Sequence, residues 1–175
     1  MGRLGLIAGG GGLPGAIAAD CRSRGRDVFI IRLKGMADPA LAAFAGEEAG
    51  MAELGKSLRA LRRAGCESVC FAGIVRRPDD FSALKPDLVA LKHLPAVIAA
   101  AGQGGDDALL RAVLAVFERE GLVVEGVGDA APGLRLDAGA YGALTPGPED
   151  QADIAAAVAA AKEVGRTDIA QGAVA

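Results

Sequence analysis

The segment Leu4-Gly5-Leu6-Ile7-Ala8-Gly9-Gly10-Gly11-Gly12-Leu13-Pro14-Gly15 decides the fold of this 175-residue chain. Its first five residues form an apolar run that four consecutive glycines close, which predicts a strand followed by a tight loop. Proline suits the first turn of a helix, so Pro14 indicates a helix that begins near Leu13 and ends before Gly25. The segment therefore predicts strand, glycine loop and helix in immediate succession.

Strands and helices keep alternating through the first 128 residues. Val28-Phe29-Ile30-Ile31 is an apolar run without polar alternation, as expected for a strand covered on both faces. Further strands are predicted at 68–72 and 122–127, and helices begin at Leu54 and Gly105 and stop at Gly65 and Gly121. Because each parallel return needs a crossover, this order predicts an α/β fold with a Rossmann-like, mostly parallel sheet and helices on both faces.

The composition changes after residue 128. Residues 129–148 are rich in Gly, Pro, Ala and Asp and show little periodicity, which is typical of a linker. A helix is expected from Glu149 to Val164, followed by a loop that enters a strand. Since one helix and half a strand cannot bury a core, we expect residues 1–128 to form one domain and residues 149–175 to begin a C-terminal domain that is otherwise absent.

The overall composition excludes several classes of function. Nineteen basic and 22 acidic side chains give a net charge of −3, and aromatic residues make up 3% with no tryptophan. The chain therefore lacks the positive field and the stacking platforms that nucleic-acid binding requires. Three cysteines without a CxxC pair, and a single histidine distant from them, predict reduced core thiols of a cytosolic protein and no zinc site. No signal peptide or membrane span is predicted.

The glycine loop has the context of a phosphate-binding site. Gly10, Gly12 and Gly15 match the pattern GxGxxG between a predicted strand and a predicted helix. Backbone without β-carbons lets a phosphate approach closely, and the N–H groups at the start of the helix point at it. A tight turn alone is the simpler explanation, but four successive glycines cost more backbone entropy than a turn needs, which favours an anion or nucleotide site. Arg32 and Lys34 end the second strand where an NAD site would have Asp or Glu, so NADPH stays open and NAD is not supported.

A second candidate region follows the strand 68–72, at the edge where open α/β sheets bind ligands. Gly73 and Ile74 begin this loop, and Arg76 and Arg77 either clamp a diphosphate or are ordinary solvated charges. Asp106 lies at a predicted helix start, where capping is the favoured role and contact with a ribose, sugar or metal is the alternative.

Four motifs together resemble one known family. They are Leu6-Ile7-Ala8-Gly9-Gly10-Gly11-Gly12-Leu13-Pro14, Ala72-Gly73-x-Val75-x-Arg77-Pro78-Asp79, Gly105-Asp106-Asp107-x-Leu109-Leu110-Arg111 and Asp168-Ile169-x-Gln171-Gly172. In this order and spacing the chain is similar to the metal-dependent UDP-2,3-diacylglucosamine pyrophosphatases of Gram-negative lipid A biosynthesis, the type with a glycine-rich N-terminal domain. The resemblance covers the whole chain and the N-terminal part of the family's length.

The resemblance implies a hydrolase in which water attacks the α-phosphorus of UDP-2,3-diacylglucosamine and releases UMP and 2,3-diacylglucosamine 1-phosphate (lipid X). It implies Mg²⁺ or Mn²⁺ as cofactor, held mainly by the C-terminal domain, and a cytoplasmic location, peripheral at the inner membrane. A homo-oligomer stays open, and no nucleic-acid partner is expected. Residues 1–128 would bind the nucleotide sugar, and the expected substrate-binding residues are Gly10, Gly11, Gly12, Leu13, Gly73, Ile74, Arg76, Arg77, Asp106, Gln171 and Gly172.

The chain departs from the family pattern in two respects. Ile74 stands where a polar or basic residue is expected, which removes one hydrogen bond to a ligand. The family's metal-binding catalytic Asp belongs to the C-terminal domain, so no catalytic residue is assigned here, and the chain alone is expected to bind uridine nucleotides weakly without hydrolysing the substrate.

Two other functions stay open: an NADPH-binding oxidoreductase domain that uses Arg32 with the glycine loop, and a regulatory or assembly domain that recruits a partner through exposed apolar surface.

Overall fold

The computed structural model describes residues 2–76, 85–93, 95, 106–139 and 141–166 of the chain. They divide into two compact units. The first comprises residues Met1–Pro95 and Leu114–Arg135, and the second comprises Ala96–Val113 and Leu136–Ala175. The first unit contains the glycine loop and the whole sheet, so the candidate site lies in this unit.

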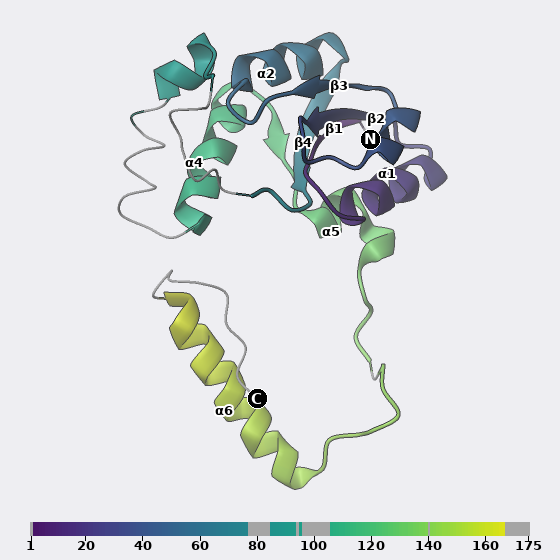
Figure 1. Cartoon of the computed structure of the whole chain (residues 1–175). Helices are drawn as coiled ribbons and strands as arrows, with labels where there is room; N and C mark the ends of the chain where they lie inside the picture. Colours follow the sequence, from purple (N-terminus) through teal and green to yellow (C-terminus); the bar gives the residue numbers. More distant parts are fainter. Residues whose placement is uncertain (1, 77–84, 94, 96–105, 140, 167–175) are drawn as a thin grey trace. The chain divides into compact units, whose positions relative to one another are not determined.

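A parallel sheet of five strands forms the centre of the first unit (Figure 1). The strands are β1 (Arg3–Ala8), β2 (Val28–Leu33), β3 (Gly46–Ala49), β4 (Cys66–Ala72) and β5 (Val123–Val124), in the spatial order β3-β2-β1-β4-β5. The chain builds the sheet outward from β1 to β3 and then returns to the other side of β1. This reversal places the topological switch point, where ligands bind in such sheets, between the carboxyl ends of β1 and β4.

Helices cover both faces of the sheet, as the sequence predicts. The helices are α1 (Leu13–Ser23), α2 (Leu54–Arg63), α4 (Asp106–Arg119), α5 (Val127–Ala130) and the 3₁₀ helices η1 (Pro39–Ala43) and η3 (Pro132–Leu134). On one face, Leu6 and Cys70 pack with Ile17 of α1 in a fully buried cluster. On the other face, Phe71 of β4 meets Phe117 of α4 edge to face, with the ring centroids 5.0 Å apart. The apolar runs at 4–8 and 28–31 are therefore strands covered on both sides, and the Rossmann-like α/β fold is confirmed.

Two predicted elements differ from the structure. The strand β3 is not predicted from the sequence, because Gly46-Glu47-Glu48-Ala49 has neither polar–apolar alternation nor β-branched residues. β3 is an edge strand that pairs with β2, and its Glu47 forms an ion pair with Arg63. The strand predicted at 122–127 is shorter and covers only Val123–Val124, because the chain enters α5 at Val127. The other strands and helices of the first unit begin and end within a few residues of the predicted positions.

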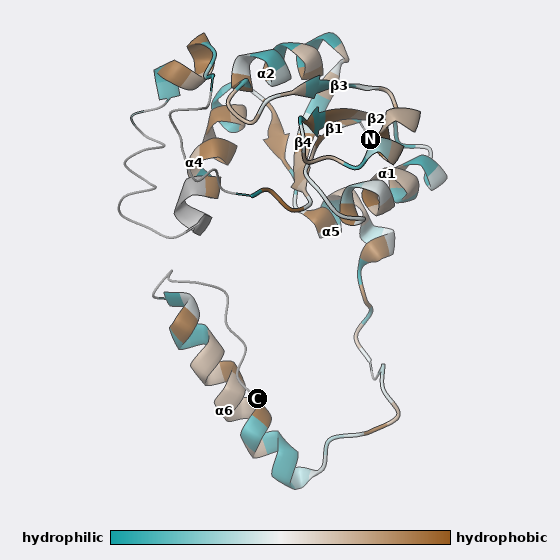
Figure 2. Cartoon of the chain, in the orientation of Figure 1, coloured by the Kyte–Doolittle hydropathy of each residue, from teal (hydrophilic) through white to brown (hydrophobic). Residues whose placement is uncertain are grey.

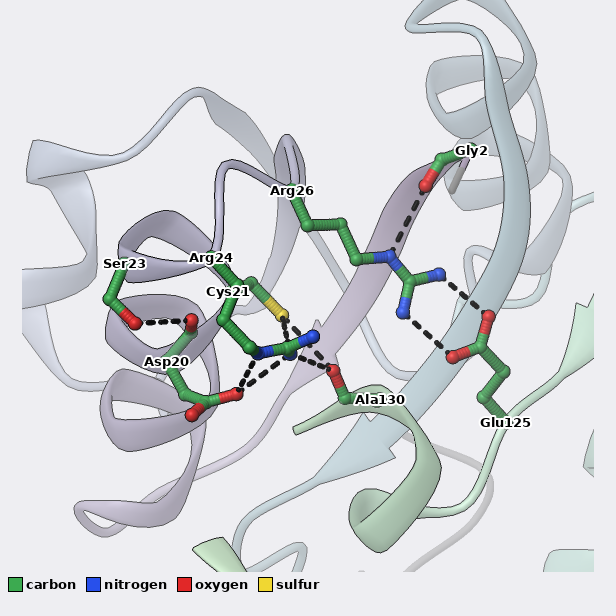
Figure 3. Close-up of polar contacts among 8 residues, drawn as sticks. All are labelled: Gly2, Asp20, Cys21, Ser23, Arg24, Arg26, Glu125 and Ala130. Carbon is green, nitrogen blue, oxygen red and sulfur yellow. Dashed lines mark hydrogen bonds and ion pairs between the residues drawn. The ribbon is translucent and has the colours of Figure 1, made fainter. Parts of the chain in front are cut away.

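Residues 129–134, assigned by sequence to the linker, lie in α5 and η3 and pack on α1. Ala130 and Ala131 are fully buried in the core. The carbonyl of Ala130 accepts hydrogen bonds from Cys21 Sγ at 3.3 Å and from Arg24 Nη2 at 2.8 Å (Figure 3). The packed part of the first unit therefore extends beyond residue 128.

A buried ion pair joins the amino-terminal side of β2 to the end of β5. The Arg26 side chain is 6% exposed and donates two hydrogen bonds to the carboxylate of Glu125, at 2.7 and 2.9 Å (Figure 3). It also donates to Ser68 Oγ and to the carbonyl of Gly2. The hydrogen bond from Arg26 lowers the pKa of Glu125. Since every one of these partners is structural, this pair stabilises the fold and is not a binding group.

The three cysteines are reduced and buried, as predicted. Burial raises the pKa of Cys66 and of Cys70 to about 11, and it also raises the pKa of Cys21. All three thiols are therefore protonated core side chains at neutral pH.

In the second unit, the helix expected at residues 149–164 is α6 (Pro148–Arg166). Its apolar stripe includes Ile154 and Val158, which are 45% and 48% exposed. No helix among the described residues is both long enough and apolar enough to cross a bilayer.

Candidate functional site

The two regions that the sequence singled out for ligand binding lie side by side at the switch point. The Gly9 amide donates to the carbonyl of Ala72 at 2.9 Å. Gly10 and Ile74 then exchange two hydrogen bonds, each 2.8 Å long, and form an isolated antiparallel bridge. The glycine loop after β1 and the loop after β4 therefore form one continuous surface at the carboxyl edge of the sheet.

Close backbone packing explains two of the glycines at this junction. A β-carbon on Gly9 would lie 2.6 Å from the carbonyl oxygen of Ile74. A β-carbon on Gly73 would lie 2.6 Å from the carbonyl oxygen of Gly10 and 2.9 Å from Cγ of Pro14, and Gly73 also has a φ of +95°. Both positions need glycine for the fold itself, with or without a ligand.

Other glycines of the loop are not explained by packing. A β-carbon on Gly12 would meet nothing within 4 Å, and one on Gly15 would make only an ordinary contact with Leu41 at 3.9 Å. Gly12 has a φ of −78°, which any residue adopts. Open space above a glycine that the backbone does not require is what close approach of a ligand would need.

Three backbone amides point out of this loop without an acceptor. Among the described residues, the N–H groups of Gly11, Gly12 and Leu13 have no hydrogen-bond partner. Gly12 is the N-cap of α1, and the helix has no capping side chain and no acidic residue in its first turn. The amides and the positive end of the helix dipole can therefore accept an anion.

The Gly10–Ile74 bridge changes the predicted role of two residues. Gly10 and Ile74 were expected to contact the substrate, but each uses its amide on the carbonyl of the other. Their N–H groups are therefore engaged with each other and hold the two loops together, so contact of Gly10 or Ile74 with a substrate would involve other atoms, such as the exposed Ile74 side chain.

Apolar side chains and one arginine surround the free amides. Leu13, Ile74 and Val75 are 44%, 68% and 47% exposed, and a β-carbon on Gly11 would lie 3.8 Å from Cδ1 of Ile74. Ile74 therefore borders the amides without covering them. Arg76 is exposed and has no ion-pair partner within the described ranges, so its guanidinium can reach for an anionic ligand.

The carbonyl of Met36 is a site feature that the sequence analysis missed. Met36 lies in the turn that follows β2, and its oxygen would lie 3.1 Å from a β-carbon on Gly10. It brings a hydrogen-bond acceptor to the side of the glycine loop opposite Ile74. Nothing in the sequence marks this position, because any residue type supplies a backbone carbonyl.

The remaining predicted residues are placed only in part. Asp106 is the first residue of α4, and because its side chain lies outside the description, neither capping nor ligand contact is tested for it. Arg77, Gln171 and Gly172 also lie outside the described residues.

Arg32, the candidate for the 2′-phosphate of NADPH, has a structural role instead. Its Nη2 donates to the carbonyl of Gly46 at 3.0 Å, and its Nη1 lies 3.5 Å from the carbonyls of Leu41 and Phe44. The guanidinium thus joins η1 and β3 to β2. These carbonyls engage the guanidinium, which weakens Arg32 as a candidate for the 2′-phosphate of NADPH, whereas Lys34 at the same strand end is exposed.

A second concavity of about 250 Å³ lies at the opposite, amino-terminal edge of the sheet. Arg22, Arg26 and Phe44 are among its lining residues. The guanidinium of Arg22 stacks on the Phe44 ring at 4.0 Å, and Arg26 is occupied by Glu125. The third lining arginine, Arg3, pairs with Asp27 and donates to the carbonyl of Ala64. Since all three arginines make contacts within the fold and the free amides lie at the other edge, the carboxyl edge is the better candidate for the functional site.

The described residues contain no cluster of three or more His, Cys, Asp or Glu side chains that could hold a metal ion. A Mg²⁺ or Mn²⁺ ion bound through one or two carboxylates and substrate phosphates is not tested by this observation.

Two comparisons relate the chain to known proteins. Residues 3–134 match the family model described as the LpxI N-terminal domain. The chain is also 51% identical, over 174 residues, to the UDP-2,3-diacylglucosamine pyrophosphatase LpxI of Caulobacter vibrioides. This alignment covers 99% of the chain and 61% of the relative, so the chain spans less than two thirds of that relative's length. The chain therefore belongs to the LpxI family and contains its N-terminal domain.

Proposed function

We propose that this chain is the nucleotide-sugar-binding part of a UDP-2,3-diacylglucosamine pyrophosphatase of lipid A biosynthesis. The activity in the name of the 51%-identical relative supports the substrate and the reaction class. The observation that carries the proposal is the set of three free amides at Gly11, Gly12 and Leu13, at the switch point of a Rossmann-like sheet. Such amides recognise a diphosphate through its charge and need no particular base.

The chain's contribution to the reaction is to bind and polarise the diphosphate. In the proposed reaction, water attacks the α-phosphorus of UDP-2,3-diacylglucosamine, the bond from this phosphorus to the bridging oxygen breaks, and UMP and lipid X separate. Negative charge then moves onto the leaving phosphate. The three amides hold fixed partial positive charge toward these oxygens, and Arg76 adds a full positive charge, so both lower the energy of the charge shift.

The cofactor and the catalytic group remain proposals that rest on the family resemblance. Mg²⁺ or Mn²⁺ would offset phosphate charge when bound, but the described residues hold no suitable ligand cluster, so we route no step through it. We assign no catalytic residue to this chain. The resemblance likewise supports a location at the cytoplasmic face of the inner membrane and leaves a homo-oligomer open.

Titration with UDP tests the proposal directly. UDP should raise the melting temperature of the purified 175-residue chain in proportion to the logarithm of its concentration, whereas NADPH should not. Arg76→Ala should weaken UDP binding, while Arg59→Ala, which removes another exposed arginine with no partner in the described part of the chain, should not. A response to NADPH without one to UDP would overturn the proposal.

Activity of the chain alone is a separate question. The 175-residue chain, incubated with UDP-2,3-diacylglucosamine and Mg²⁺, should release no UMP, because no catalytic group is assigned to it. Release of UMP at a rate that depends on Arg76 would place the catalytic group within this chain and contradict that assignment.

A further inference from the structure

The concavity at the amino-terminal edge of the sheet has a positively charged lining that the proposed function does not use. Its volume is about 250 Å³, and its walls come from β1, α1, the start of β2 and the residues just before β3. Every lining residue lies between positions 3 and 45, a stretch that the structure describes without a gap. Pockets for drug-sized ligands have volumes of about 300–1,000 Å³, so this smaller concavity suits a small polar ligand.

Arg22 lines this concavity with its side-chain hydrogen-bond donors free. Its guanidinium stacks on the Phe44 ring, with Cζ 4.0 Å from the ring centroid. Stacking uses the flat face of the guanidinium, whereas the N–H groups lie in its plane. Among the residues that the structure describes, none accepts a hydrogen bond from the Arg22 side chain or forms an ion pair with it. The aromatic ring therefore holds the side chain in place and leaves a charged fork available to an anion.

Arg3 adds further donors from the first strand. Its Nη1 donates to the carbonyl of Ala64 at 2.7 Å, whereas its Nη2 makes no hydrogen bond within the described ranges and lies 3.5 Å from the carboxylate of Asp27. Its Nε is buried and also has no hydrogen-bond partner in the described part of the chain. Buried donors in native proteins almost always have a partner, so Arg3 would gain hydrogen bonds from an acceptor that reaches this side chain.

The lining of the concavity carries more positive than negative charge. It includes Arg3, Arg22 and Arg26 but a single acidic residue, Asp27. Arg26 is neutralised by Glu125 (Figure 3), which leaves two arginines against one aspartate. The Asp27 side chain is 78% exposed, so water and salt screen its charge and its pair with Arg3 is weak. Figure 2 shows the carboxyl-terminal end of α1, which carries Arg22, in the teal of hydrophilic residues.

We propose that this concavity, which we call the amino-edge site (Arg3, Arg22, Arg26, Asp27 and Phe44), binds a small phosphate-type anion, either inorganic phosphate or the phosphate group of a monoester. Guanidinium forks match the paired oxygens of carboxylates and phosphates. One fork occupies both oxygens of a carboxylate, whereas a phosphate has enough oxygens for Arg22 and Arg3 together. An anion held by both residues connects β1 to the end of α1 and stabilises the folded unit by mass action.

The amino-edge site is separate from the free amides at Gly11, Gly12 and Leu13, which lie at the opposite edge of the sheet. It takes part in no step of the proposed reaction, and the inference does not depend on that reaction. The two sites therefore have to be distinguished by residue-specific signals and by variants that affect one edge only.

A titration of the ¹⁵N-labelled 175-residue chain with inorganic phosphate, followed by ¹H–¹⁵N correlation spectra, tests the proposal. The side-chain Nε–H signal of Arg22 and the backbone amide signals of Gly25 and Asp27, which also line the concavity, should shift along one saturating curve. Sodium chloride at the same ionic strength should not produce this curve. The same titration with glycerol 3-phosphate distinguishes the two sources, because tighter binding of the ester indicates a monoester site and tighter binding of phosphate indicates a site for the free ion.

Arg22→Gln should weaken phosphate binding at these signals by about tenfold, because it removes a charge-assisted pair of hydrogen bonds. Arg3→Lys, which keeps the charge but removes the fork, should also weaken it and replaces the first variant if Arg22→Gln does not fold. Arg59→Gln, which removes the same charge from an exposed position of α2, and Arg76→Ala at the other edge should leave the curve unchanged.

Three results would overturn the proposal: no saturating shift at the amino-edge signals, an equal shift with chloride, or a loss of affinity in Arg59→Gln or Arg76→Ala as large as in Arg22→Gln. Binding of UDP should be unchanged in Arg22→Gln. Failure of the phosphate titration therefore leaves the proposed function standing, and failure of the UDP titration leaves the amino-edge site standing.

Discussion

Gly73→Ala is the substitution for which the structure predicts the sharpest effect. Gly73 has a φ of +95°, and a new methyl group would lie 2.6 Å from the carbonyl oxygen of Gly10 and 2.9 Å from the carbonyl carbon of Gly9. Left-handed backbone costs a non-glycine residue about 1–2 kcal/mol. Overpacking against backbone that cannot rotate away adds about 1–3 kcal/mol. The free energy of unfolding should therefore fall by about 2–5 kcal/mol when the two costs are combined.

Gly121→Ala is the matched control for the steric part. Gly121 has a similar φ of +88°, but a β-carbon there would meet no atom within 4 Å. This variant should lose only the backbone cost of about 1–2 kcal/mol. The difference between the two variants then isolates the contact between the glycine loop and the loop after β4.

Urea unfolding followed by circular dichroism measures both losses, and UDP titration of each folded variant measures the site. The methyl group of Gly73→Ala must push apart the two loops that the Gly10–Ile74 bridge joins, so UDP affinity should fall for this variant and not for Gly121→Ala. Equal destabilisation of the two variants, with unchanged UDP affinity, would refute the view that close packing of these loops builds the site.

Three further predictions concern the amides, the buried ion pair and the thiols. Gly12→Ala should change the free energy of unfolding by less than about 1 kcal/mol, since open space receives the methyl group, yet weaken UDP binding measured by calorimetry. Glu125→Gln should cost about 3–5 kcal/mol at pH 7, because it leaves Arg26 buried without its counter-charge. Since the pKa of Glu125 is lowered from 4.5, its contribution is complete above pH 4.5 and is lost as the pH falls through the lowered pKa, so the gap between wild type and variant in urea melts should close at acidic pH. Cys66 and Cys70, whose pKa burial raises to about 11, should react with a thiol reagent at pH 8 only after urea unfolding; fast labelling of the native protein would contradict their burial.

The sequence predicts the central part of the fold because the buried strands and helix faces require apolar residues, and these are visible in the sequence. Runs such as Val28–Ile31 favour strands covered on both faces, and Gly65 follows the end of α2 with a φ of +72°. β3 was not predicted, because an edge strand is held by backbone hydrogen bonds to β2, and such bonds place little demand on side chains. Residues 129–134 were assigned to a linker because alanine and proline carry no periodicity, although Ala130 and Ala131 are fully buried in the core cluster that includes residues of α1.

The candidate site is also predictable from the sequence only in part. The glycine pattern predicts the position of the anion site, but only the structure distinguishes glycines required by packing, such as Gly73, from Gly12, which packing does not require. The contacts of Arg32 were likewise not predictable from the sequence. An arginine at a strand end has the right charge for a phosphate, and the backbone carbonyls that occupy it here come from Leu41, Phe44 and Gly46, which sequence alone does not place near it.

The bridge between Gly10 and Ile74 determines which kind of ligand the site favours. Because both residues use their amides on each other, a phosphate bound at the proposed site would lie on the outer side of the two loops, against Gly11, Gly12 and Leu13. On that side it meets the exposed side chains of Leu13 and Ile74. A dinucleotide carries no aliphatic part for such a rim, whereas a diacylated sugar diphosphate carries both a charge for the amides and chains for the apolar side chains. Ile74 in place of a polar residue therefore fits an amphiphilic ligand: its backbone holds the site together, and its side chain extends the apolar surface beside the phosphate.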